Sequence, residues 1–279
     1  MRTALAFALL ASVMMGAPRI QVHGHRGARA VLPENTIPAF EHAIEVGADV
    51  LELDMAVTKD NVVVVSHDPE LNPKICKGPA GLPKGIRQLT LEQLRQFDCG
   101  ATANADYPKQ RAVPGTRMPT LDEVLALARR GTFEFNIETK IFKDKPEYTP
   151  SPEEFTRLVV DLVRKHKLEK RVILQSFDFR TLEACKKIAP EIRLSALYAI
   201  GLKDFVGIAK DSGARIVSPH YMLVTKGRVE EAHKAGLQVV PWTANTVRDW
   251  DRLVEAGVDA IITDDPAALI EYLKGRALR

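Results

Sequence analysis

The chain has 279 residues, 46% hydrophobic and 27% charged, and its 39 basic and 36 acidic residues give a net charge of +3. A disordered chain is excluded, because the apolar content is high and the net charge is low. No nucleic acid is expected as a partner, because +3 over this length gives no dominant positive field. Three cysteines are too few for a disulfide-built scaffold. The length fits one or two domains, and barrels of about 250 residues are often single domains.

The N-terminus has the pattern of a secretory signal. Arg2 is followed by an uncharged stretch, 3–17, that ends in the small residues Gly16 and Ala17. We predict a signal peptide over 1–17, an exported protein in the periplasm or outside the cell, and no stable membrane insertion of the mature chain. The stretch is too short to span a bilayer comfortably. The alternative is an N-terminal helix that packs on the fold.

Nine short apolar runs alternate with helical patterns along the rest of the chain. Four residues, 58–61, separate the second run from the third, which predicts an antiparallel hairpin there. The remaining eight runs are linked by helical segments, so the predicted fold is an α/β protein of the (β/α)8 TIM-barrel type. The predicted strands are 20–24, 50–57, 62–67, 133–139, 172–176, 193–198, 215–218, 237–242 and 260–263.

Helix start signals support this alternation. Asn35 is the predicted N-cap of a helix that runs to Glu45. Thr120 and Glu123 have the spacing of a capping box at the start of another helix. Ser151, followed by proline and two acidic residues, opens a third.

The region from about 71 to 118 interrupts the pattern. It is rich in glycine and proline, and one short helix, 91–97, is predicted in it. A segment this long without regular structure predicts a functional loop or a small insertion in a single domain of 18–279. Cys76 and Cys99 both lie in it and could form a disulfide in an exported protein. Cys185 lies in a helical pattern and is predicted to be a buried free thiol.

Two acidic residues on one predicted strand carry the strongest functional signal. Glu52 and Asp54 are two positions apart, so their side chains point to the same face of an otherwise apolar strand. Two neighbouring carboxylates on an apolar strand persist only where a cation, a base or water compensates them. A divalent metal is the usual compensation, and oxygen ligands suit Ca2+ or Mg2+.

The hairpin register suggests a histidine beside this pair. If 60–61 form a two-residue turn, cross-strand partners have numbers that sum to 121, and His67 faces Asp54. An imidazole next to a metal site is a candidate general acid or base. His25 ends the first strand, where the catalytic residues of barrels are found. Arg26 beside it has the fork geometry that suits phosphate.

A later strand adds a third carboxylate. Glu138 and Lys140 share one face near its C-terminal end, so Glu138 would join the metal ligands and Lys140 would add a cation. Each of these residues alone has an ordinary structural explanation, such as a salt bridge for Arg26. Their joint occurrence at strand ends indicates metal-assisted phosphoryl chemistry.

On these residues the chain resembles the glycerophosphodiester phosphodiesterase family, within the broader group of phospholipase-C-like barrels. The family signature is a His-Arg pair, a Glu-x-Asp pair and a following histidine, here His25-Arg26, Glu52-Leu53-Asp54 and His67. Further matches reach from Glu34-Asn35-Thr36 through Gln175-Ser176-Phe177 to Thr263-Asp264, nearly the whole mature chain.

The resemblance implies the release of an alcohol and sn-glycerol 3-phosphate from a small glycerophosphodiester. One divalent metal would be held by Glu52, Asp54 and Glu138. Arg26 and Lys140 would steady the phosphate, and Phe177 and Trp242 would flank the substrate. His25 and His67 would be the acid and base of a two-step reaction through a cyclic phosphate. Two alternatives stay open: a lysophospholipid or phosphoinositide substrate on the same barrel, and a catalytically silent binding protein.

Overall fold

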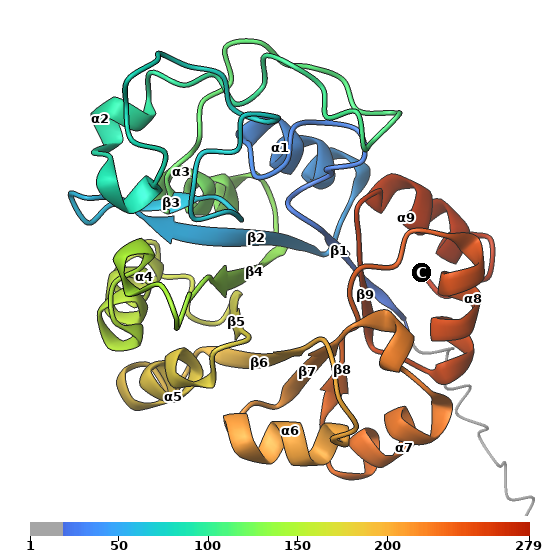
Figure 1. The fold of residues 1–279 in the computed structure, drawn as a ribbon. Helices are drawn as coiled ribbons and strands as arrows, with labels where there is room; N and C mark the ends of the chain where they lie inside the picture. Colours follow the sequence, from blue (N-terminus) through green and yellow to red (C-terminus); the bar gives the residue numbers. More distant parts are fainter. Residues whose placement is uncertain (1–18) are drawn as a thin grey trace, which may run out of the picture.

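Eight parallel strands form the wall of a barrel in the computed structural model, which describes residues 19–279 (Figure 1). The strand order is β8-β7-β6-β5-β4-β2-β1-β9. The barrel closes between the first and last strands of this order, β8 and β9. There the Asp259 N–H donates to the Val239 carbonyl, and the Ile262 N–H donates to the Pro241 carbonyl. The barrel strands are β1 (Gln21–Gly24), β2 (Val50–Val57), β4 (Glu134–Thr139), β5 (Val172–Ser176), β6 (Arg193–Tyr198), β7 (Ile216–Pro219), β8 (Gln238–Val239) and β9 (Ala260–Thr263). The predicted barrel is confirmed. The predicted signal peptide lies outside the described residues.

Helices surround the barrel and follow the strands in the chain (Figure 1). They are α1 (Ile37–Val46), α2 (Leu91–Leu94), α3 (Leu121–Leu125), α4 (Pro152–Lys165), α5 (Phe179–Ile188), α6 (Phe205–Ser212), α7 (Lys226–Lys234), α8 (Val247–Ala256) and α9 (Pro266–Lys274). Short 3-10 turns occur at Ile86–Gln88, Ala126–Arg130, Pro146–Tyr148 and Tyr221–Leu223.

Two of the three predicted helix starts are confirmed. The Thr120 hydroxyl accepts from the Glu123 amide, and the Glu123 carboxylate accepts from the Thr120 amide, which is the predicted capping box of α3. Ser151 caps α4 as predicted. The cap at Asn35 is wrong by one residue, because Thr36 caps α1. Asn35 has a φ of 56° and uses its side chain elsewhere, at the barrel mouth.

The hairpin forms between β2 and β3 (Val63–Val65), but its predicted register is wrong. Met55 pairs with Val65, so partner numbers sum to 120 rather than 121, and Asp54 is opposite Ser66 instead of His67. The turn has three residues, 59–61, and its last residue, Asn61, has a φ of 61°. A left-handed third residue is typical of three-residue hairpins, which shift the pairing by one position.

The insertion builds a small core of its own on the outer face of this hairpin. Ala56 and Val64 belong to a buried apolar cluster of ten residues that also includes Leu71, Ile86 and Phe97. The disulfide between Cys76 and Cys99 is formed, as predicted, and its sulfurs are buried in this cluster. The third cysteine, Cys185, is free and buried on α5, also as predicted.

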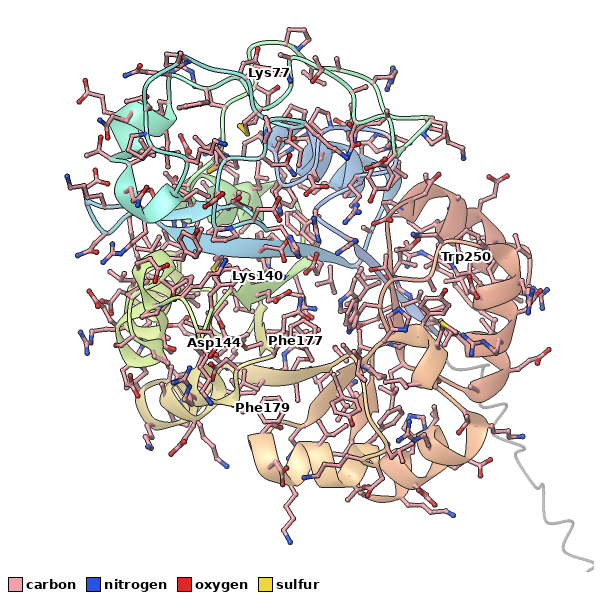
Figure 2. All side chains as sticks on the ribbon, viewed as in Figure 1. Lys77, Lys140, Asp144, Phe177, Phe179 and Trp250 are labelled. Carbon is pink, nitrogen blue, oxygen red and sulfur yellow. A yellow bond between two sulfur atoms is a disulfide. The ribbon has the colours of Figure 1, made fainter. Side chains whose placement is uncertain are left out.

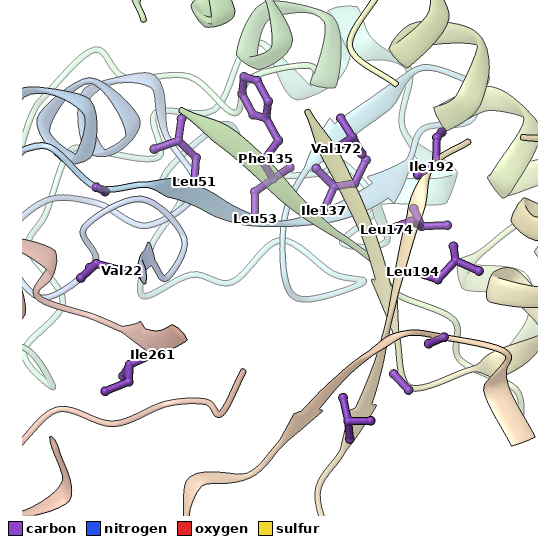
Figure 3. Packing of buried hydrophobic residues seen from close by; sticks show 14 of the residues in the cluster. Val22, Leu51, Leu53, Phe135, Ile137, Val172, Leu174, Ile192, Leu194 and Ile261 are labelled. Carbon is purple, nitrogen blue, oxygen red and sulfur yellow. The ribbon is translucent and has the colours of Figure 1, made fainter. Parts of the chain in front are cut away.

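The main core lies between the barrel wall and the surrounding helices. Figure 3 shows Leu51, Phe135 and Val172 among the outward-facing strand residues that fill it. A separate apolar cluster fills part of the barrel interior, and it consists of Ile173, Ile216, Val240, Ala260 and Ile262. Burial of both faces explains why the strands are apolar runs, and it leaves the strand ends as the place for polar side chains.

Candidate active site

One cavity of about 230 Å³ opens where the C-terminal ends of the strands meet. All nine site residues predicted from the sequence line it: His25, Arg26, Glu52, Asp54, His67, Glu138, Lys140, Phe177 and Trp242. Figure 2 shows Lys140 and Phe177 beside the centre of the barrel. Residues from six different strands or strand ends therefore converge on one small volume, as is usual for barrel active sites.

Three carboxylates crowd one wall of this cavity. Glu52 and Asp54 point inward from β2, and Glu138 on β4 is the register partner of Asp54. One oxygen from each lies within 4.8 Å of the others, and all three residues are buried. This spacing allows the three oxygens to hold one divalent ion, because hard cations take several carboxylate oxygens at once.

The electrostatics of the trio favour a bound cation. Burial raises the pKa of Glu52 well above its ordinary value, and the charges of Asp54 and Glu138 raise it further. Burial also raises the pKa of Glu138, where Lys140 opposes the shift. Asp54 behaves differently: burial opposes its ionisation, but Lys140 and Arg26 outweigh burial and lower its pKa.

Two cations share this anionic wall. The Lys140 Nζ lies 2.7 Å from Glu138 and 3.1 Å from Asp54, and this pair of carboxylates raises the pKa of Lys140 to about 12 against the effect of burial. Arg26 contacts Asp54 through Nε at 3.1 Å and Glu34 through its terminal nitrogen at 2.6 Å. Its backbone N–H also donates to Glu52. Both cations thus hold the carboxylates in place while facing the cavity.

His25 is held by a hydrogen-bonded frame at the end of β1. Its Nδ1 lies 2.6 Å from Asp264, which leaves Nε2 on the cavity side, 3.9 Å from Glu52. Asp264 also accepts from Asn245 and lies 3.3 Å from Arg29. Burial would raise the pKa of Asp264, but His25 and Arg29 outweigh it and keep this carboxylate ionised. Burial is also the main cause of the lowered pKa of His25.

His67 reaches the cavity by a different route from the one predicted. The chain leaves the sheet after Val65, so the position of His67 depends on the loop that leads into the insertion and not on cross-strand pairing. Its Nδ1 lies 2.8 Å from Asp68, and Asp68 accepts from Asn72. The imidazole of His67 therefore has an acidic partner on Nδ1, as His25 has.

Two aromatic side chains also line the cavity. The rings of Phe177 and Trp242 meet edge to face with centroids 5.5 Å apart. The indole N–H donates to the Ser218 carbonyl at 2.8 Å, which fixes the Trp242 ring. These rings give the cavity an apolar side, in addition to the wall formed by the carboxylate trio.

Sequence reasoning missed the residues that orient this machinery. Gln175 donates to Glu52 at 2.8 Å and accepts from Asn136, while Asn35 donates to Asp54. Asp264 had no assigned role, although it directly follows the last strand. The positions of these residues in the sequence could have indicated such a role, because a polar residue at or just after the end of a barrel strand faces the mouth.

The arrangement suits one class of reaction. A divalent ion on the carboxylate trio can stabilise a phosphate oxygen, and two imidazoles with free Nε2 atoms can donate and accept protons on either side. A barrel with such a mouth defines a metal-dependent hydrolase of phosphate esters.

Comparison with known proteins identifies the family. The sequence profile described as "Glycerophosphoryl diester phosphodiesterase family" matches residues 25–268. A glycerophosphodiester phosphodiesterase from Caldanaerobacter subterraneus subsp. tengcongensis is 35% identical over 253 residues, 91% of this chain and 97% of that protein. The chain therefore belongs to the glycerophosphoryl diester phosphodiesterase family, and it is a phosphodiester hydrolase of a family that uses a divalent metal.

Solved structures agree on the fold. A proposed glycerophosphoryl diester phosphodiesterase from Silicibacter pomeroyi DSS-3 superposes with a TM-score of 0.87 and 29% identity, over 94% of this chain and 96% of that one. A phosphodiesterase from Oleispira antarctica, solved with its product sn-glycerol-3-phosphate, has a TM-score of 0.79 and 22% identity over 92% and 97% of the two chains. Within residues 19–279, no helix has the length and apolar character needed to cross a membrane.

Proposed function

We propose that this protein hydrolyses glycerophosphodiesters to an alcohol and sn-glycerol 3-phosphate, with one divalent metal and with His25 and His67 as the acid–base pair. The observation that carries the proposal is the shared cavity, which brings both imidazoles and the three carboxylates to one volume at the barrel mouth. A phosphodiester with a short glycerol arm is small enough for a cavity of about 230 Å³.

The metal would be held by Glu52, Asp54 and Glu138, and Ca2+ or Mg2+ fits this all-oxygen donor set. When bound, the ion supplies electrostatic stabilisation of negative charge on phosphate oxygens. Gln175 and the Arg26 backbone N–H each donate to one oxygen of Glu52, so its carboxylate is oriented before any ligand arrives. Such preorganisation is what a metal site requires of its surroundings.

The phosphate would lie in the cavity next to the metal position and the two cations. Arg26 and Lys140 face the cavity, and each already neutralises Asp54. A bound phosphodiester would take up part of their hydrogen-bonding capacity and bring its own negative charge next to both. Phe177 and Trp242 would then contact the glycerol or the alcohol group on the apolar side.

The reaction would proceed in two steps. In the first, one histidine removes the proton from a free glycerol hydroxyl, whose oxygen attacks the phosphorus, while the other histidine protonates the departing alcohol oxygen. In the second, water attacks the cyclic phosphate with the roles of the histidines exchanged, and the ring opens to glycerol 3-phosphate. Asp264 and Asp68 hold His25 and His67 through Nδ1, so that Nε2 of each is free to exchange protons.

We also propose that the protein is exported. The charged start and uncharged stretch at 1–17 support this, and so does the Cys76–Cys99 disulfide, because disulfides persist in oxidising compartments. Expression of the full chain followed by cell fractionation and N-terminal sequencing tests the proposal. Recovery in the periplasm or medium with an N-terminus near Pro18 is expected, and a cytoplasmic protein that retains Met1 would contradict it.

The hydrolytic proposal is tested by release of glycerol 3-phosphate from glycerophosphocholine, with and without a chelator. We expect release that stops on chelation and returns when Ca2+ or Mg2+ is added. Activity on a lysophospholipid or a phosphoinositide but not on glycerophosphocholine would favour the second substrate class. Substrate binding without turnover in any metal would identify a silent binding protein.

A further inference from the structure

Exposed apolar side chains are concentrated on one side of the barrel mouth. Among residues 19–279, seven large apolar side chains are exposed: Phe177, Ile188, Ile200, Leu202, Val206, Met222 and Val247. Ile188 lies at the far end of α5, whereas the other six follow the C-terminal ends of strands β5 to β8. Single exposed apolar residues are common on any surface, but six of seven gathered at one end of the molecule form a pattern.

These six residues, which we call the apolar arc, lie on neighbouring loops and on the first turns of α6 and α8. Strands β5, β6, β7 and β8 are adjacent in the sheet and occupy one side of the barrel in Figure 1. The most exposed of these side chains are on the loop after β6, where Ile200 and Leu202 are 86% and 99% exposed. Phe177 belongs to both the arc and the cavity wall, so the arc is continuous with the apolar side of the cavity.

The other side of the mouth has a different surface. The segment after β1, residues 25–36, has no fully exposed residue, and its charged side chains are engaged with one another. Arg26 and Arg29 both contact Glu34, for example. The mouth is therefore divided into a charged, internally paired side and an apolar, projecting side.

The first turns of α7 and α8, next to the arc, also carry cations with no acidic partner. Lys226 and Arg248 are exposed there, and among residues 19–279 neither has a salt-bridge partner. The acidic side chains on the same loops are engaged at helix N-termini. Asp178 and Asp204 accept backbone N–H groups of α5 and α6, and Asp249 accepts from the Thr246 hydroxyl. Unpaired positive charge thus lies next to the arc at Lys226 and Arg248, close in the chain to Met222 and Val247.

We propose that the apolar arc docks on the surface of an anionic phospholipid bilayer. Apolar loop tips flanked by lysine and arginine match the two layers of such a surface, an acyl region under anionic head groups. In this orientation the cavity opens toward the bilayer through Phe177. The inference goes beyond hydrolysis, because docking requires neither the metal ligands nor the two histidines.

Sedimentation with lipid vesicles tests the apolar component. Wild-type protein should sediment with vesicles of phosphatidylglycerol and phosphatidylcholine in equal amounts, and less with phosphatidylcholine alone. The double variant Ile200→Glu/Leu202→Glu should bind the mixed vesicles at least about tenfold more weakly, because its new charges oppose insertion. Ile188→Glu is the matched control at the opposite end of α5 and should bind as wild type does.

A second pair of variants tests the charge component. Lys226→Ala and Arg248→Ala should each weaken binding to the mixed vesicles about fivefold at low salt, the value for one basic residue near an anionic surface. Hydrolysis of soluble glycerophosphocholine should be unchanged in all these variants. The proposal is overturned if wild-type protein does not sediment, if Ile188→Glu loses as much binding, or if the arc variants instead dissociate a protein oligomer in size-exclusion chromatography with light scattering.

Discussion

The two histidines of the cavity differ in how they are held. His25 directly follows β1, and its side chain is 11% exposed within a frame of Asp264, Asn245 and Arg29. His67 stands on a loop outside the sheet, its side chain is 37% exposed, and its partners Asp68 and Asn72 come from the same loop. One of the two histidines is thus positioned by the barrel and the other by the loop that leads into the insertion.

This difference suggests that the barrel and the insertion have different roles in positioning the residues of the cavity. Barrel strands fix side chains precisely because each strand is paired on both sides and buried on both faces. A loop that packs on a separate small core can vary in length and contacts without disturbing the barrel. We therefore expect changes near His25 to affect chemistry strongly, and changes near His67 to affect both chemistry and substrate access.

The largest effect is expected from removal of either imidazole. His25→Ala and His67→Ala should each lower kcat by about 10² to 10⁴, the usual contribution of a general acid or base. Steady-state release of glycerol 3-phosphate measures this loss. His233→Ala, on α7 beside Asp259, is the matched control and should retain normal turnover. Near-normal activity in both active-site variants would remove the acid–base assignment.

A smaller effect is expected when the acidic partner of either imidazole is replaced. Asp264→Asn should reduce kcat about 10- to 100-fold with little change in KM, because the charged acceptor that fixes the His25 ring becomes a neutral amide. Asp68→Asn should cost less, because the more exposed His67 can be solvated and reoriented by water. Equal losses in the two variants would show that the barrel holds His25 no more firmly than the loop holds His67.

The barrel was predictable from the sequence because its signals are local. Apolar β-branched runs and helix caps such as Thr120 and Ser151 act over a few residues, and each was confirmed. The cavity was predictable for a related reason: parallel strands bring their C-terminal ends together, so Glu52, Asp54 and Glu138 had to meet once their strands were assigned.

What the sequence could not determine depends on backbone detail. Asn61 in the left-handed region shifts the hairpin by one residue, and either a two- or a three-residue turn was compatible with the same letters. Asn35 is a residue type that is common at helix N-caps, but here it adopts a positive φ and its side chain donates to Asp54. Long-range partners such as Asp264 and His25, 239 positions apart, become visible only when the ring of strands is closed.

The insertion can be destabilised without changing the barrel if its disulfide is removed. Cys76→Ser/Cys99→Ser should lower the free energy of unfolding by about 3 kcal/mol, the entropic estimate for a loop of this size. Activity should fall only a few-fold, through the position of His67. Chemical denaturation and turnover assays measure the two effects. A variant with unchanged stability would show that the small core holds the insertion without the cross-link.

The smallest effect on activity is expected at a third histidine. Burial lowers the pKa of His23 from 6.5 to about 3, against the opposing charge of Asp49 and with a smaller contribution from Arg193. Between these pH values the unfolded chain binds a proton that the folded chain does not, so His23 makes stability fall as the pH falls from about 6.5 toward 3. His23→Leu should remove up to about 1.4 kcal/mol of stability loss per pH unit in this window.

Denaturation of wild type and His23→Leu across this pH range measures the difference. Turnover at neutral pH should be the same in both proteins, because His23 is buried beneath the mouth and does not line the cavity. Identical pH dependence of stability in the two proteins would show that folding does not lower the pKa of His23.

The central claim is that three acidic side chains share one ion in the same cavity as the two imidazoles. Calorimetric titration of Mg2+ or Ca2+ into wild type and into the variants Glu52→Gln and Glu138→Gln tests it most directly. We predict one bound ion per chain in wild type, with binding and turnover lost together in both variants. Undiminished binding in the variants, or turnover that persists after complete chelation, would contradict the claim.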